Sequence, residues 1–122
     1  MICHSMTPIL RIFDEQKAKE FYLEFLEFGV EFEHRYEDGF PLYMSVTMSG
    51  ITIHLSEHHG DATPGSTIRI GVTGLEDYHK KLLAKTYKFA RPGLERTPWD
   101  NVEMSLADPF GNRLVFYEMD AG

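Results

Sequence analysis

A turn near the end of the chain, at residues 108–112, constrains the fold more than any other feature of the sequence. It reads Asp-Pro-Phe-Gly-Asn, and the apolar run Arg-Leu-Val-Phe-Tyr-Glu follows it. Asp and Pro start a tight turn, and Gly takes the position that needs a positive φ. The run after it has the length and composition of a strand. We therefore expect the last strand to be entered through a fixed turn.

The first half of the chain predicts a strand, a helix and three more strands. A strand at Thr7–Phe13 ends at Asp14, a good helix N-cap. Apolar residues from Asp14 to Phe28 recur at three-and-four spacing, which predicts an amphipathic helix that stops at Gly29. The three strands that follow are predicted, between Asp-Gly and Ser-Gly turn signals, at Val30–Tyr36, Leu42–Met48 and Ile51–Ser56.

The second half repeats this order after a polar loop at residues 57–65. The predicted elements are a strand at Thr67–Val72, a helix at Leu75–Leu83, and strands at Lys88–Ala90, Val102–Leu106 and Leu114–Tyr117. The repeated order indicates a duplicated module. We expect a single domain over residues 1–122, with module one at about 6–59 and module two at about 66–119.

Composition and charge narrow the range of functions that the chain can have. The chain has 122 residues, with 19 acidic against 12 basic residues and a formal charge of −7. This acidity argues against a nucleic-acid partner and is compatible with a cationic ligand or with solubility alone. The sequence has no apolar run long enough for a membrane span, no signal-peptide pattern and one cysteine, Cys3, so a cytoplasmic protein without a membrane partner is expected.

Strand alternation divides the side chains between two faces. One face is apolar, suits packing against the helices, and comprises Leu10, Ile12, Ile51, Ile53, Leu55, Ile68, Ile70, Val72, Leu114 and Phe116. The other mixes charges, hydroxyls and rings, and comprises Ile9, Arg11, Thr52, His54, Ser56, Thr67, Arg69, Arg113, Val115 and Tyr117. Such a face lines a ligand pocket or meets solvent, and alternation alone leaves both open.

These residues resemble the vicinal oxygen chelate superfamily, also called the glyoxalase/bleomycin resistance protein/dioxygenase superfamily. The resemblance covers nearly the whole chain and is best at residues 8–12, 18–22, 98–99 and 108–114. It implies an α+β fold of two paired βαβββ modules that form a curved mixed sheet around a cleft. The Asp-Pro-x-Gly-Asn turn is good evidence for this fold and weak evidence for an activity.

The resemblance also bears on metal binding. The positions that hold the ion in metal-dependent members carry Thr7, His54, Thr67 and Val115 here, and only His54 is a usual ligand. We therefore expect no metal, no other cofactor and no catalytic residue. His58 would lie about 13 Å from His54 along an extended strand, although a bend of the loop could return it or His59, and His4 stays open as well.

The bleomycin resistance branch fits best, through Pro8, the Pro98-Trp99 pair and the acidic charge. It implies a homodimer, hinged at Pro8, that captures a bleomycin-class antibiotic without changing it. Trp99 would stack on the drug, although Asp100 follows where the family usually has glycine. The candidate ligand-binding residues are Phe32, Tyr36, Phe40, Tyr43, His54, Ser56, Glu57, Arg69, Trp99, Glu103, Arg113 and Tyr117.

Two alternatives stay open. One is a metal-dependent lyase or dioxygenase of the same superfamily. The other is a binder of a small anionic metabolite, because Arg11, Arg69 and Arg113 share the polar face and guanidinium groups suit carboxylates and phosphates.

Overall fold

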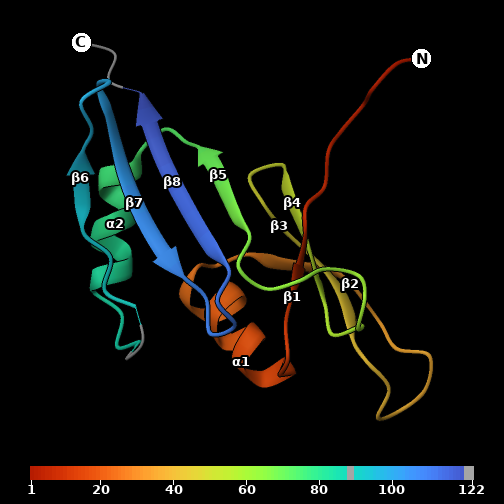
Figure 1. Ribbon diagram of the computed structural model, residues 1–122. Coiled ribbons are helices and arrows are strands. Elements are labelled where there is room, and N and C mark those ends of the chain that lie inside the picture. Colours follow the sequence, from red (N-terminus) through yellow and green to blue (C-terminus); the bar gives the residue numbers. More distant parts are fainter. Residues whose placement is uncertain (88–89, 120–122) are drawn as a thin grey trace. The chain divides into compact units, whose positions relative to one another are not determined.

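The computed structural model describes residues 1–87 and 90–119. The chain divides into two compact units, Met1–Pro64 and Gly65–Gly122, and each unit has its own four-stranded mixed sheet (Figure 1). The predicted α+β class and the repeated strand–helix–strands order are confirmed. The union of the two modules in one domain stays a prediction.

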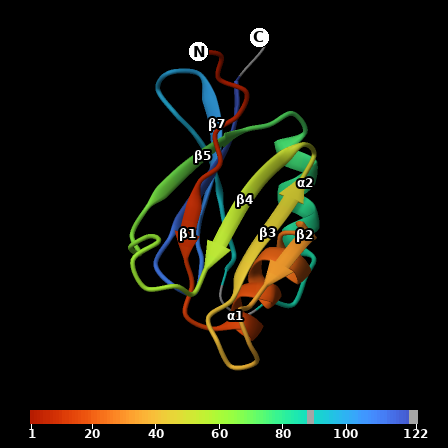
Figure 2. The ribbon, with the colours of Figure 1, turned by 90° about the vertical axis from the view of Figure 1, so that its right-hand side faces the viewer.

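The first unit contains β1 (Ile9–Arg11), the helix α1 (Glu15–Lys19) with its π-helical continuation η1 (Glu20–Phe25), β2 (Gly29–His34), β3 (Tyr43–Met48) and β4 (Ile51–Ser56). Its strands lie side by side in the order β1-β4-β3-β2 (Figure 2). β1 runs parallel to β4, and the other neighbours are antiparallel. A parallel edge strand needs a crossover, and the helical segment supplies it.

The second unit contains β5 (Thr67–Gly71), α2 (Leu75–Leu83), β6 (Leu94–Arg96), β7 (Asn101–Ala107) and β8 (Arg113–Met119). The strand order is β5-β8-β7-β6, with β5 parallel to β8. The predicted bounds of α2 are confirmed. The strand predicted at Lys88–Ala90 includes residues 88–89, which lie outside the described residues, whereas β6 was not predicted at all.

The first helix starts as predicted and ends differently. Asp14 caps it, because its Oδ1 accepts a hydrogen bond of 2.8 Å from the Lys17 N–H. The prediction that it continues to Phe28 and stops at Gly29 is wrong: η1 ends at Phe25, and Glu27 takes the left-handed φ of 72°. Each π turn of η1 takes more residues than an α turn, and Gly29 is already the first residue of β2.

The turn before β8 forms as predicted. Oδ1 of Asp108 accepts hydrogen bonds of 2.8 Å from the N–H groups of Phe110 and Asn112, while Oδ2 accepts one of 2.9 Å from the Asn112 side chain. Gly111 has a φ of 91°, the conformation for which glycine is suited. The turn therefore fixes the entry of β8.

Most of the predicted apolar face is buried. Phe21, Tyr22 and Phe25 from the first helical segment and Leu75 and Leu82 from α2 are at most 2% exposed. The buried residues of that face are Leu10, Ile12, Ile53, Leu55, Ile70, Leu114 and Phe116. The exceptions are Ile51, at the start of β4, with 37% of its surface exposed, and Ile68 and Val72, which are partly exposed. In the described part of the chain, no helix is long and apolar enough to span a membrane.

Candidate functional site

Three predicted site residues meet on the first sheet. Phe32 of β2, Tyr43 of β3 and His54 of β4 form a cluster that we call the aromatic triad. The ring centroids lie 6.4 Å apart for Phe32 and Tyr43, 5.6 Å for Phe32 and His54, and 5.2 Å for Tyr43 and His54. The Phe32 and Tyr43 rings are nearly parallel, at 9°, and the imidazole makes a T-shaped arrangement with each of them. Such faces accept further planar groups by stacking.

Strand register explains why these residues meet. Ser45 pairs with His54 on one side and with Phe32 on the other, and directly opposed residues point to the same face of a sheet. Tyr43 lies two residues from Ser45 and therefore shares that face. Ser45 itself is fully buried, while 42% of Phe32 is exposed.

A register shift in β2 adds a carboxylate beside the triad. Val30 pairs with Val46 and Phe32 with Ser45, so Glu31 is an extra residue at a bulge. Its Oε1 accepts a hydrogen bond of 2.9 Å from the Ser45 hydroxyl. Strict alternation gives Glu31 the face opposite to Phe32, so sequence reasoning missed it. No turn residue in the sequence marks the bulge.

The hydroxyl of Tyr43 lies 2.6 Å from Nδ1 of His54, within hydrogen-bond distance. Burial raises the pKa of Tyr43 above its usual value of 10.0, and the carboxylate of Asp61 raises that pKa further. Tyr43 is therefore a neutral phenol at physiological pH and keeps its proton for a hydrogen bond.

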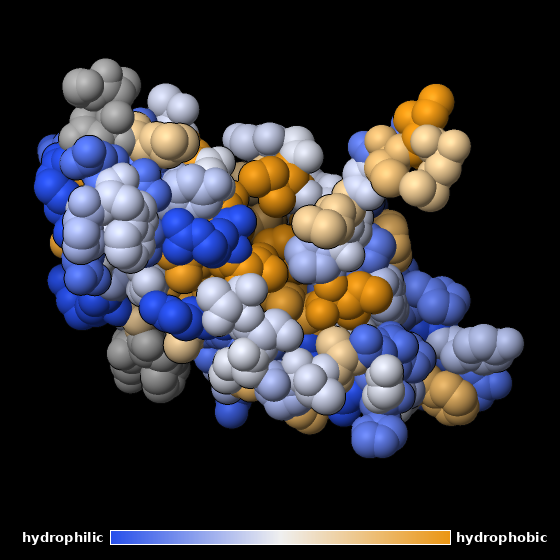
Figure 3. All heavy atoms as spheres, turned by 45° about the horizontal axis from the view of Figure 1, so that its top comes forward, coloured by the Kyte–Doolittle hydropathy of each residue, from blue (hydrophilic) through white to orange (hydrophobic). Residues whose placement is uncertain are grey.

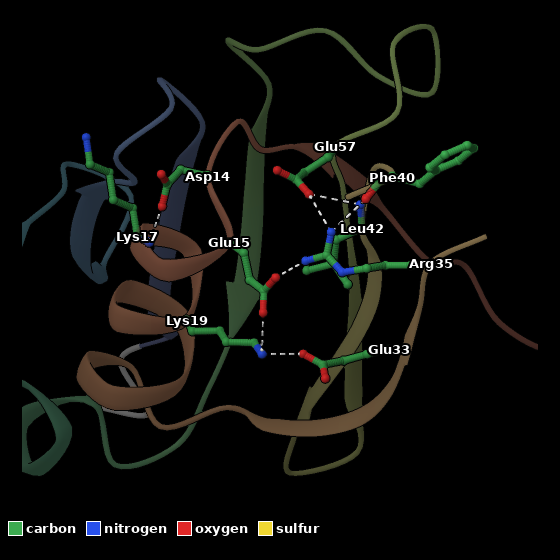
Figure 4. Close-up of polar contacts among 9 residues, drawn as sticks. All are labelled: Asp14, Glu15, Lys17, Lys19, Glu33, Arg35, Phe40, Leu42 and Glu57. Atoms are coloured by element: carbon green, nitrogen blue, oxygen red, sulfur yellow. Dashed lines mark hydrogen bonds and ion pairs between the residues drawn. The ribbon is translucent and has the colours of Figure 1, made fainter. Parts of the chain in front are cut away.

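Besides its predicted ligand role, Glu57 takes part in a network of hydrogen bonds and ion pairs within the first unit. Its Oε1 accepts a hydrogen bond of 2.9 Å from the Leu42 N–H and lies 3.8 Å from Nη1 of Arg35 (Figure 4). Arg35 also donates a hydrogen bond of 2.6 Å to the Phe40 carbonyl and pairs with Glu15 of α1. The network joins the β2–β3 loop to the helix and to the end of β4.

The two aromatic residues of that loop region are exposed. Tyr36 is 81% exposed and meets His34 edge-on at 6.4 Å, while the Phe40 side chain is 47% exposed. Figure 3 shows hydrophobic side chains at the surface among hydrophilic ones on the face it views. Nothing in the first unit brings Tyr36 or Phe40 into the aromatic triad, and their roles as ligand contacts stay predictions.

Ser56 is fully buried at the end of β4. Its hydroxyl donates a hydrogen bond of 2.7 Å to Asp61 Oδ2 and accepts one of 3.0 Å from the His58 N–H. Both bonds hold the turn that follows the strand. The hydroxyl therefore has local partners, and a ligand contact from Ser56 stays a prediction.

In the second unit, Arg69, Glu103 and Tyr117 form another cluster. Arg69 donates a hydrogen bond of 2.9 Å to Glu103 Oε2, and its guanidinium lies 4.6 Å from the centroid of the Tyr117 ring. The hydrogen bond to Glu103 raises the pKa of Arg69. Since the carboxylate compensates this charge, Arg69 is less suited to an anionic ligand than its position on the polar face predicts.

The other two arginines of the predicted polar face also have local contacts. The Arg113 guanidinium donates a hydrogen bond of 3.3 Å to the Ser105 hydroxyl. The Arg11 guanidinium, in the first unit, lies 4.7 Å from the centroid of the Phe13 ring. Val115, which shares the polar parity, is 3% exposed and therefore buried.

Trp99 lies in the hairpin turn between β6 and β7 and is 64% exposed. The turn is closed by a hydrogen bond of 2.8 Å from the Thr97 N–H to the Asn101 carbonyl. Asp100 has a φ of 62°, so this residue adopts the left-handed conformation that glycine takes most easily. Trp99 is thus an accessible ring on a tight turn.

The metal positions of the superfamily do not fit an ion here. Within residues 1–87 and 90–119, no three His, Cys, Asp or Glu side chains come together in a group that could hold one. At His54, Nδ1 is already within hydrogen-bond distance of Tyr43, and the position equivalent to the last ligand carries the buried Val115. A catalytic zinc site uses about three protein ligands.

Two βαβββ modules with these mixed sheets define a protein of the glyoxalase/bleomycin resistance fold. The chain belongs to the glyoxalase superfamily, since the family model described as "Glyoxalase superfamily protein" matches residues 1–122. The predicted resemblance is thereby confirmed. No curated protein matches the chain.

Solved structures with the same fold are described as having different functions. TnmS3, an antibiotic binding protein from Streptomyces sp. CB03234, is 19% identical with a TM-score of 0.73, and the match covers 98% of each chain. A bleomycin-binding protein complexed with bleomycin is 20% identical with a TM-score of 0.69, covering 97% of this chain and 100% of the other. A glyoxalase-related enzyme from Clostridium phytofermentans is 19% identical with a TM-score of 0.75, covering 98% and 97%. These likenesses show the fold.

Proposed function

We propose that this protein binds a small molecule reversibly and without chemical change, and that its ligand is an antibiotic of the bleomycin class. The observation that carries the proposal is the aromatic triad, with its parallel Phe32 and Tyr43 rings and the partly exposed Phe32. Structures described as binding bleomycin or another antibiotic share the fold and support the choice of ligand. We further propose that the protein acts as a cytoplasmic homodimer.

Charge supports the same choice. The formal charge of −7 favours a cationic ligand over an anionic one. Glu31 lies beside the triad, and Glu103 compensates Arg69 in the second unit. A planar ligand with a cationic group would gain from the rings and from the acidic surroundings together.

The test is calorimetric titration of bleomycin, metal-free and copper-loaded, into the purified protein. We expect saturable binding at one site per chain, together with a change in the fluorescence of Trp99. Phe32→Ala should weaken binding about three- to tenfold, as loss of one stacked ring predicts. Phe13→Ala is the matched control, because Phe13 is a half-exposed phenylalanine of the same unit outside the triad.

If neither metal-free nor copper-loaded bleomycin binds in the calorimeter, the bleomycin proposal is refuted. Equal losses in both variants would refute the assignment of the ligand to the aromatic triad. Stoichiometric zinc, nickel, iron or manganese in protein purified under mild conditions would favour the metal-dependent alternative instead. Tight citrate or phosphate binding that depends on Arg69 would favour the anionic ligand.

A further inference from the structure

The hydrogen bond between Tyr43 and His54 determines what the aromatic triad can offer a ligand. The 2.6 Å separation of the Tyr43 hydroxyl and His54 Nδ1 falls in the range of hydroxyl donors, about 2.5–3.0 Å. It is shorter than the range of about 2.7–3.2 Å for N–H donors. The short separation favours the hydroxyl as the donor and Nδ1 as the acceptor.

The surroundings of Tyr43 support this direction. Among the described residues, His54 Nδ1 is the hydrogen-bond partner of the Tyr43 hydroxyl, and no second acceptor competes for its proton. If Nδ1 carried the proton instead, the half-buried hydroxyl would lose its acceptor. A neutral imidazole whose Nδ1 accepts must carry its proton on Nε2.

We infer that Tyr43 fixes His54 as the neutral Nε2–H tautomer, so that the site presents one N–H donor beside the ring faces of the triad. The inference rests on the proposed function, which supplies the ligand. It adds a rule for which ligands the site prefers, which we call the recognition rule. The preferred ligand carries a hydrogen-bond acceptor, a carbonyl oxygen or a neutral ring nitrogen, at the edge of a planar ring. Tyr43 is a positioning residue in this arrangement, and His54 makes the contact.

The position of His54 suits this role. Nε2 is the ring nitrogen farther from the backbone, and within the described part of the chain it makes no hydrogen bond. The imidazole stands at 71° to the Phe32 ring and 77° to the Tyr43 ring. A planar group stacked on either ring would lie at a steep angle to the imidazole. Such a planar group could therefore direct a hydrogen-bond acceptor on its edge at the Nε2–H group.

The first experiment reads the tautomer without any ligand. Two-bond nitrogen–proton correlation spectra of the nitrogen-15-labelled protein should show His54 Nε2 protonated and Nδ1 bare. In Tyr43→Phe, which keeps the ring and removes the donor, the two nitrogens should move toward the averaged values of exchanging tautomers. Thr52→Val is the control, because it removes a hydroxyl from β4, the strand of His54, and leaves the Tyr43–His54 pair intact. A protonated Nδ1 in the wild-type protein would overturn the inference.

The second experiment tests recognition with two probes, isoquinoline and naphthalene, which share a shape and differ by one ring nitrogen. Followed by ligand-observed nuclear magnetic resonance, isoquinoline should bind the wild type more tightly, and Tyr43→Phe should weaken it about three- to tenfold. Naphthalene should bind both proteins equally, and Thr52→Val should change neither. Equal binding of the two probes would overturn the recognition rule.

The two proposals fail separately. If bleomycin does not bind while the tautomer and probe results hold, the proposed function fails and the recognition rule stands. If bleomycin binds and isoquinoline shows no advantage, the proposed function stands and the recognition rule fails.

Discussion

The ring of Tyr117 lies against the backbone of Gly71. A Cβ built on Gly71 would come within 3.0 Å of the Tyr117 hydroxyl and 3.1 Å of its ring. The two residues are paired across β5 and β8, and Arg69 stacks on the same ring. Any side chain at position 71 must therefore move Tyr117 and disturb the cluster with Arg69.

Gly71→Ala should destabilise the protein by about 1 kcal/mol, the lower end of the range for overpacking, since the added methyl group crowds the Tyr117 side chain at an exposed position. Urea unfolding followed by circular dichroism measures the change. Gly93→Ala is the matched control, because a Cβ there meets nothing within 4 Å. The control should be stabilised by about 0.4–1 kcal/mol rather than destabilised, because the substitution restricts the unfolded chain without a clash. Equal stability of the two variants would contradict the contact.

Glu118 caps α2 from a neighbouring strand. Its Oε1 accepts hydrogen bonds of 3.1 Å from the Gly74 N–H and 3.0 Å from the Leu75 N–H, and Gly74 has no side chain for this task. Glu118→Ala should therefore cost about 1 kcal/mol of stability, as the loss of an N-cap does. Glu76→Ala, an exposed residue of the same helix, should change stability by only about 0.3 kcal/mol. Thermal or urea unfolding that shows no difference between them would refute the cap.

Asp100 holds a backbone conformation that favours glycine. With its φ of 62°, Asp100→Gly should raise the free energy of unfolding by about 0.5–1 kcal/mol, because it relieves the left-handed penalty. Asp100→Ala should bring no such gain, since alanine keeps the Cβ. Chemical denaturation of the pair gives the comparison. A stabilising alanine would show that the backbone strain is not the cause.

Stability should depend on pH through Tyr43. The folded-state pKa lies above 10.0, so the folded protein holds this proton more tightly than the unfolded chain does. The resulting stabilisation is fully present below pH 10.0 and is lost as the pH rises through the folded pKa. Tyr43→Phe lacks this group, so the stability advantage of the wild type should shrink at alkaline pH. A difference that stays constant or grows across this range would contradict the raised pKa.

The sequence predicted elements well where a clear period meets clear turn residues. β4 at Ile51–Ser56 and α2 at Leu75–Leu83 have their predicted bounds. The end of the first helix could not be predicted, because Glu27 rather than a glycine takes the left-handed turn. β6 was missed because Glu95 and Arg96 give a short edge strand no apolar pattern.

The candidate site was predicted as separate residues rather than as an arrangement. Phe32, Tyr43 and His54 were each identified, and their meeting depends on the register of three strands, which alternation within one strand does not determine. Glu31 was missed because the bulge reverses the face that its position in the sequence predicts. The ligand-binding roles themselves stay predictions until the titrations are made.

Every strand pair in the described structure joins residues of the same unit, and this has a consequence for folding. Closing the chain between β1 and β4, or between β5 and β8, requires loops of only a little more than a third of the chain length, and loop-closure entropy grows with loop length. Each sheet can thus assemble without waiting for the other half. Native-state hydrogen exchange should accordingly reveal two cooperative opening units, divided near Pro64 and Gly65.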